Sequence, residues 1–160
     1  MGARSTAREA ALQMLFALES GAEPVEFVIK SFWRESPGDP EARSYADDLV
    51  RQVDAAQSNL DRLIGVASQN WRLERMALVD RNILRLATRE LIVAREVQID
   101  QSLKNDEADA PRAVVIDEAV ELAKRYGSEE SGKFVNGILE RIANDLEAMA
   151  DLPLNDKVNS

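Results

Sequence analysis

The stretch from residue 115 to residue 139, VIDEAVELAKRYGSEESGKFVNGIL, most constrains the fold of this chain. Its first half has apolar residues at the i, i+3, i+4, i+7 spacing of a buried helical stripe, namely Ile116, Ala119, Val120 and Ala123. Gly127 ends this pattern, and Lys124 and Arg125 place cations in the last turn, where helix carbonyl groups are partly negative. A second helix is expected to begin near the Lys-Phe pair at residues 133 and 134.

The same helical period recurs along the rest of the chain. Helices are predicted from a Thr6-x-x-Glu9 capping box up to Ser20-Gly21, over Val25–Glu35 after Pro24, over about 41–67, as a short turn at 73–76, and over 79–97. No segment alternates apolar and polar residues as a half-buried strand does. We therefore expect an all-α protein with two small helical bundles side by side. Residues 1–70 and 71–150 form the bundles, Trp71 marks the junction, and 151–160 is a flexible tail.

Residues 98–111 stand apart because their polar composition predicts a mobile loop. Asp100, Asp106 and Asp109 raise the question of a calcium site. An EF-hand loop also needs a glycine at its sixth position and a terminal bidentate carboxylate, and the segment has no such register. A solvated acidic loop is the better interpretation, and no metal site is predicted.

Composition excludes several classes of function. The 160-residue chain is 45% hydrophobic but only 5% aromatic, which favours helices packed through aliphatic side chains. It contains no Cys and no His, so it lacks disulfides, thiolate zinc sites and the commonest general base. It has neither an apolar run long enough to span a membrane nor a signal peptide. We expect a cytoplasmic protein that is not an enzyme and carries no cofactor.

Charge is distributed unevenly. The formal net charge of −9 opposes nucleic-acid binding, because phosphate contacts need Lys or Arg. Residues 71–95, however, hold six arginines against three acids, whereas residues 96–118 hold seven acids against two basic residues. The distribution of charge, more than its total, therefore decides what the chain can bind.

Three blocks of sequence resemble the NusB family of bacterial transcription antitermination factors. They are A-R-E-A-A-L-Q-M-L-F at residues 7–16, D-R-N-I-L-R-L-A at residues 80–87 with Glu90-Leu91 after it, and the stretch at 115–139. The family's dense N-terminal arginine cluster is reduced here to Arg4 and Arg8. The resemblance implies an all-helical adaptor that binds the boxA element of ribosomal RNA leaders. Its implied partners are the ribosomal protein NusE and the RNA polymerase antitermination complex.

The resemblance also implies an RNA face, which consists of Arg4, Arg8, Gln13, Phe16, Glu130, Ser131, Lys133 and Phe134. Arg4 and Arg8 lie one helical turn apart, so both guanidinium groups can face successive phosphates. An ordinary exposed helix end fits their spacing equally well. Phe16 could stack on a base, although core packing is its simpler role. Lys133 lies at a helix N-terminus, which favours phosphate.

The resemblance places the NusE-binding face on the central helix, with Asp80, Arg81 and Arg85. On the residues alone, a solvated helical stripe explains them as well. Two other functions stay open at this point. The chain could be the NusB-like RNA-binding domain of a ribosomal RNA cytosine methyltransferase without its catalytic domain, or a helical scaffold that has lost RNA binding.

Overall fold

The computed structural model describes residues 2–69, 72–103 and 110–150, and within these ranges the chain is helical without strands. The α-helices are α1 (Ala3–Ser20), α2 (Val25–Glu35), α3 (Pro40–Ser68), α4 (Leu78–Ile99), α5 (Arg112–Tyr126) and α6 (Ser131–Ala150). Two short 3₁₀ helices, η1 (Leu73–Arg75) and η2 (Gln101–Leu103), flank α4. The all-α prediction is confirmed.

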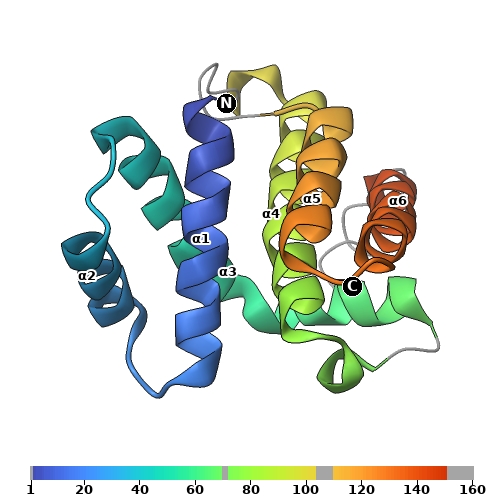
Figure 1. The fold of residues 1–160 in the computed structure, drawn as a ribbon. Coiled ribbons are helices and arrows are strands. Elements are labelled where there is room, and N and C mark those ends of the chain that lie inside the picture. The colour runs from blue at the N-terminus through green and yellow to red at the C-terminus, as the bar shows by residue number, and fades with distance from the viewer. Residues whose placement is uncertain (1, 70–71, 104–109, 151–160) are drawn as a thin grey trace.

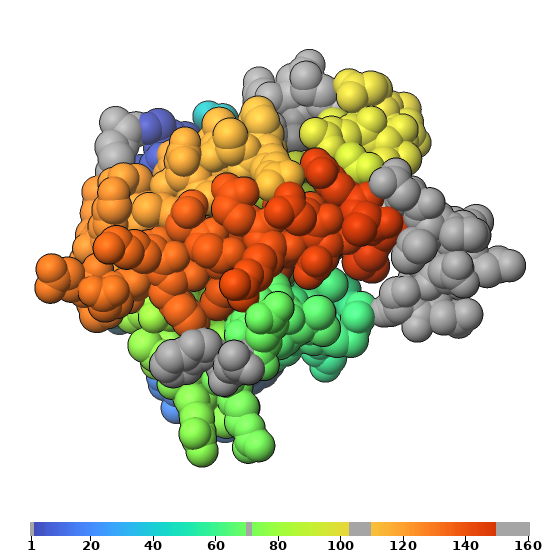
Figure 2. All heavy atoms as spheres, turned by 90° about the vertical axis from the view of Figure 1, so that its right-hand side faces the viewer, coloured from blue at the N-terminus to red at the C-terminus, as the bar shows by residue number. Residues whose placement is uncertain are grey.

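Helix α1 occupies the middle of the molecule (Figure 1). It packs against α2 and α3 on one side and against α4 on the other. Helix α4 in turn contacts α5 and α6, and α6 lies across α5 and the C-terminal part of α3 (Figure 2). One continuous core joins these elements, and its largest fully buried side chains include Leu12, Met14, Leu60, Ile64, Ile83, Leu84, Leu139 and Ile142.

Local sequence sets the helix ends. Pro24 precedes α2 at a φ of −67°, and the helix then covers Val25–Glu35 as predicted. Helix α3 begins at Pro40, whose missing N–H costs nothing there, and the Asp39 side chain accepts a hydrogen bond from the Ala42 N–H at 3.1 Å. Helix α5 ends at Gly127, as its sequence indicates.

Two predictions about local structure are wrong. The capping box at Thr6 does not form, because α1 already begins at Ala3 and the Thr6 hydroxyl donates to the Gly2 carbonyl at 3.4 Å. The predicted loop from residue 98 is also partly helical, since α4 continues to Ile99 and η2 follows it. Trp71, Asp106, Asp109 and the predicted tail lie outside the described residues.

Helix α3 packs against helices from both halves of the chain. Its 29 residues span roughly 43 Å at 1.5 Å per residue. Along this length it packs against α1 and α2, and also against α4 and α6. The division of the chain at residue 70 therefore stays a prediction, because α3 contributes to the packing on both sides of it.

Candidate nucleic-acid and partner interface

The first two turns of α1 carry both N-terminal arginines, and both face Tyr45 of α3. The Arg4 guanidinium carbon lies 4.1 Å from the centre of the Tyr45 ring, and that of Arg8 lies 5.8 Å from it. Arg8 donates from Nε and Nη2 to the Glu90 carboxylate at 2.8–3.1 Å. The Tyr45 hydroxyl donates to the same carboxylate at 2.7 Å. The two arginines thus share a face of α1, as their spacing predicted.

The prediction had Arg8 exposed on this face, but its side chain is turned toward the core. Arg8 is only 3% exposed and Glu90 only 7%. Burial by itself lowers the pKa of Arg8, but the hydrogen bond and charge of Glu90 outweigh it and the net pKa is raised. In this structure the Arg8 guanidinium is committed to Glu90 inside the protein, so it does not present a fork to solvent as Arg4 and Arg8 were expected to do together.

A second face of α1 is fastened to α5 by side-chain contacts that we call the α1/α5 seam. The Ser5 hydroxyl donates to the Glu118 carboxylate at 3.0 Å. One turn further, Glu9 accepts the Tyr126 hydroxyl and lies 2.9 Å from Arg125 Nη1. Both helices advance in the same direction between these contacts. The turn after Tyr126 therefore lies beside the middle of α1 (Figure 1).

Gln13 and Phe16 extend the same face of α1 beyond the seam. Gln13 lies one turn after Glu9 and is exposed. Phe16 lies at the next position of this stripe and is half-buried, with part of its ring packed on the core. Gln13 is therefore accessible on this face of α1, and Phe16 offers part of its ring there.

The α5–α6 turn is held by its own hydrogen bonds. The Ser131 hydroxyl accepts the backbone N–H of Ser128 at 2.9 Å, and Ser131 is 2% exposed. Ser131 thus orders the turn, and its place on the RNA face stays a prediction. Glu130 and Lys133 are exposed beside it, and Phe134 is partly buried against the core.

The predicted partner-binding residues at the start of α4 are more buried than a solvated stripe would be. Asp80 is 8% exposed, and its buried Oδ1 has no hydrogen-bond partner among the described residues. Arg81 donates to Glu19 at 2.9 Å, and Arg85 donates to Glu19 and Asp61 at 2.7 Å. These arginines already hold carboxylates of α1 and α3.

An open hollow of about 290 Å³ lies over this network, and we call it the charged hollow; it is lined by Glu19, Asp61, Leu73, Glu74, Arg81 and Arg85. The three acids were missed by sequence reasoning. They lie on α1, α3 and η1, and no spacing within one helix signals that these elements meet. Burial raises the pKa of Glu19, but the hydrogen bonds from Arg81 and Arg85 outweigh it and the net pKa is lowered.

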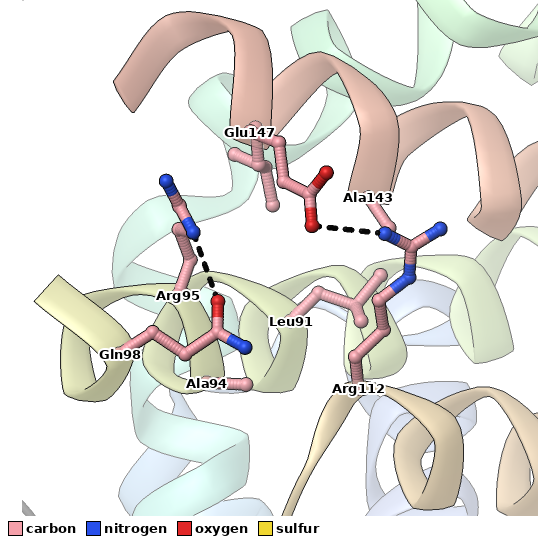
Figure 3. Close-up of a pocket in the computed structure, with 8 residues that line it drawn as sticks. Leu91, Ala94, Arg95, Gln98, Arg112, Ala143 and Glu147 are labelled. Carbon is pink, nitrogen blue, oxygen red and sulfur yellow. Dashed lines mark hydrogen bonds and ion pairs between the residues drawn. The ribbon is translucent and has the colours of Figure 1, made fainter. Parts of the chain in front are cut away.

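A second, narrower pocket of about 20 Å³ lies where the ends of α4 and α6 meet the start of α5 (Figure 3). Leu91, Ala94, Ala143 and Leu146 form its apolar walls. Arg112 pairs with Glu147 at 3.2 Å, and Arg95 donates to Gln98 at 2.9 Å (Figure 3). Arg95 Nε is buried without a hydrogen-bond partner among the described residues, and the pocket is too small for a cofactor.

The described residues also give no sign of metal or membrane chemistry. Among them, His, Cys, Asp and Glu form no group of three or more that could hold a metal ion. None of the described helices is both long and apolar enough to cross a bilayer.

Comparison with known proteins shows the family to which this chain belongs. The sequence model described as the NusB family matches residues 5–144. The chain belongs to the NusB family. It is 59% identical to the transcription antitermination protein NusB of Sorangium cellulosum, over 91% of this chain and 95% of that protein. It is 42% identical to the NusB of Myxococcus xanthus, over 89% and 96% of the two chains.

Solved NusB structures share the fold. NusB of T. maritima superposes with a TM-score of 0.73 at 37% identity, over 98% of this chain and 97% of that one. The NusB family is also represented by a crystal structure of antitermination factors NusB and NusE in complex with dsRNA. That structure gives a TM-score of 0.73 at 29% identity, over 91% and 98% of the chains. The family prediction made from the three sequence blocks is confirmed.

Proposed function

We propose that this chain is a transcription antitermination factor that binds boxA-type RNA of ribosomal RNA leaders together with NusE, within an RNA polymerase antitermination complex. Its relatives carry the name transcription antitermination protein, and one structural neighbour was solved with NusE and dsRNA. The observation that carries the proposal is the α1/α5 seam. Through Glu9, Arg125 and Tyr126 it brings two segments that are far apart in sequence onto one surface.

The RNA side of this proposal uses the exposed groups around the α5–α6 turn. Lys133 supplies a cation in the first turn of α6, where backbone N–H groups favour a phosphate. Phe16 offers part of an aromatic face, and stacking of a base on such a ring is worth about 1–3 kcal/mol. The exposed Glu130 carboxylate would accept a hydrogen bond from the amine of a base. With so few cations, RNA binding by the chain alone should be weak.

The partner side of the proposal is the charged hollow. Arg81 and Arg85 fix the carboxylates of Glu19 and Asp61 at its wall, so these arginines act on a partner through the acids that they position. Ribosomal proteins are typically basic because they pack against RNA. A Lys or Arg of NusE would be attracted to the acids of this hollow.

We propose no catalytic activity for the chain, since it has neither His nor Cys, and Arg8 and Arg85 are paired with carboxylates of the protein itself. The alternative of a methyltransferase's RNA-binding domain is less well supported. The curated relatives are antitermination proteins, and the chain covers 95–97% of their length in the matches to Sorangium, Myxococcus and Geobacter.

A titration tests the proposal directly. Fluorescence anisotropy of a labelled boxA-type single-stranded RNA, and of a scrambled RNA of equal length, is measured with and without NusE over a salt series. We expect preference for boxA, tighter binding with NusE, and a shallow salt dependence for the chain alone. Equal affinity for both RNAs, unaffected by NusE, would favour a helical scaffold without RNA function.

A further inference from the structure

Cations are scarce on the surface proposed to bind RNA. Arg8 is enclosed with Glu90, and Arg4 is half-buried over the Tyr45 ring. Arg125, which sequence analysis assigned only to the end of a helix, is different. Its side chain is 49% exposed, and it lies in the last turn of α5, one residue before the Tyr126 that reaches α1. Arg125 is therefore a cation located between the two segments that form the surface.

We propose that Arg125 is an RNA-contacting residue, and that its guanidinium exchanges the Glu9 carboxylate for an RNA phosphate when RNA binds across the α1/α5 seam. This inference rests on the function proposed above and assigns a contact within that site. The ligand chemistry is that of a phosphodiester, which the planar guanidinium fork can bind with two parallel hydrogen bonds.

Breaking the Arg125–Glu9 ion pair costs little free energy in this structure. Arg125 Nη1 lies 2.9 Å from Glu9 Oε1, but nearly half of the Arg125 side chain is in contact with solvent, where ion pairs contribute little net stability. Glu9 also keeps a second partner, because the Tyr126 hydroxyl donates to the same oxygen. The Tyr126 hydrogen bond is the largest cause of the lowered pKa of Glu9, and it can hold the carboxylate in place after Arg125 leaves.

The position of Arg125 fits a continuous path for RNA. Gln13 follows Glu9 by one turn of α1 on the same face, and the α5–α6 turn with Lys133 follows Arg125 in the chain. Arg125 thus contacts the helix that carries the amide of Gln13 and precedes Lys133 by eight residues in the chain.

The neighbouring Lys124 provides a matched control. It carries the same charge and is 64% exposed, but it pairs with Glu121 of its own helix at 3.7 Å. Its side chain also lies against α6, where a Cβ added at Gly132 would lie 3.4 Å from Lys124 Cγ. Removing Lys124 changes the net charge as much as removing Arg125 does, but it leaves the seam intact.

The test compares Arg125→Ala, Arg125→Lys and Lys124→Ala in the boxA RNA titration. We expect Arg125→Ala to weaken binding about fivefold and to reduce the salt slope by about 0.7, the value for one phosphate contact on a single strand. Arg125→Lys should restore the slope and part of the affinity, and Lys124→Ala should change both by much less. The assignment is overturned if wild type binds the RNA and Arg125→Ala binds it with the same affinity and salt slope. It is also overturned if Lys124→Ala loses as much affinity as Arg125→Ala.

A double-mutant cycle separates a direct contact from general repulsion. Glu9→Gln removes the internal competitor, so it should tighten RNA binding in the wild-type background and have much less effect beside Arg125→Ala. An equal gain in both backgrounds would mean that only the overall charge matters, which contradicts the exchange. If wild type itself fails to bind boxA RNA in any condition, the proposed function falls, and this inference falls with it.

Discussion

Arg8 is a buried cation in a hydrogen-bonded cluster to which three helices contribute. It lies on α1, its carboxylate partner Glu90 lies on α4, and Tyr45 of α3 donates to that carboxylate. Breaking such a pair by removing one member leaves the other charge buried without compensation. At this scale we therefore expect Arg8, one of the two arginines predicted to bind RNA, to contribute to stability through Glu90.

Arg8→Ala should lower the free energy of unfolding by about 3–5 kcal/mol, because Glu90 would stay buried without its cation. Urea denaturation followed by circular dichroism measures this. Arg51→Ala is the control, since Arg51 also pairs bidentately with a carboxylate, that of Glu26, but is 45% exposed, and it should cost less than about 1 kcal/mol. Similar losses in the two variants would show that burial is not the cause.

Glu19 should make stability depend on pH. Its folded-state pKa is lowered below the ordinary value of 4.5, so its contribution is fully present above that value and is lost as pH falls through the folded-state pKa. The stability difference between wild type and Glu19→Gln should be largest near neutral pH and shrink below about 4.5. Urea denaturation at a series of pH values measures this, and a constant difference would show that Glu19 is not the acid-sensitive group.

At the scale of elements, the α5–α6 turn requires a glycine for close approach. Gly127 has a φ of −97°, which any residue can adopt, but a Cβ there would lie 2.7 Å from the Ala123 carbonyl oxygen and would collide with the Ser131 hydroxyl. The Ser131 hydroxyl is the group that orders the turn. Side-chain volume at residue 127 therefore disturbs the start of α6.

Gly127→Ala should destabilise the protein by about 1–3 kcal/mol, as overpacking does in a tight site. The control is Gly137→Ala in the interior of α6, where no atom would lie within 4 Å of the new Cβ. That variant should gain about 0.5–1 kcal/mol from the better helix propensity of alanine. Thermal and urea unfolding of both variants measure the contrast, and a loss in Gly137→Ala would contradict the packing argument.

The helices were largely predictable because their signals are local. Pro24, Asp39 with Pro40, and Gly127 fix helix ends within a few residues, and apolar stripes fix the buried faces. The candidate site was less predictable, because it depends on which helices meet. The spacing of Arg4 and Arg8 indicates a shared face, but Glu90 lies 82 residues after Arg8. The same holds for Glu19 and Asp61, whose importance depends on Arg85 in another helix.

At the scale of the whole molecule, the net charge of −9 should act on association with a basic partner. We expect the association rate with NusE to fall steeply as salt rises, because long-range attraction is screened over about 8–10 Å. Stopped-flow fluorescence measures this rate. A rate that is independent of salt would show that the acidic surface does not steer the encounter.

The charged hollow should dominate this steering. Glu74→Lys, at the exposed edge of the hollow, should slow association about threefold or more. Glu35→Lys, which makes the same charge change at the exposed end of α2, should slow it less. Equal effects would place the partner elsewhere on the surface.

The contacts of α1 have a consequence for the nascent chain. During synthesis, Glu90, the partner of Arg8, is added 82 residues after Arg8, and Glu118, the partner of Ser5, is added 113 residues after Ser5. At translation rates of about 5–20 residues per second, the second interval lasts roughly 6–23 s. For most of that time α1 is without α4, one of the helices against which it packs. Helix α1 therefore completes its packing late, because the α1/α5 seam cannot form before Tyr126 has been translated.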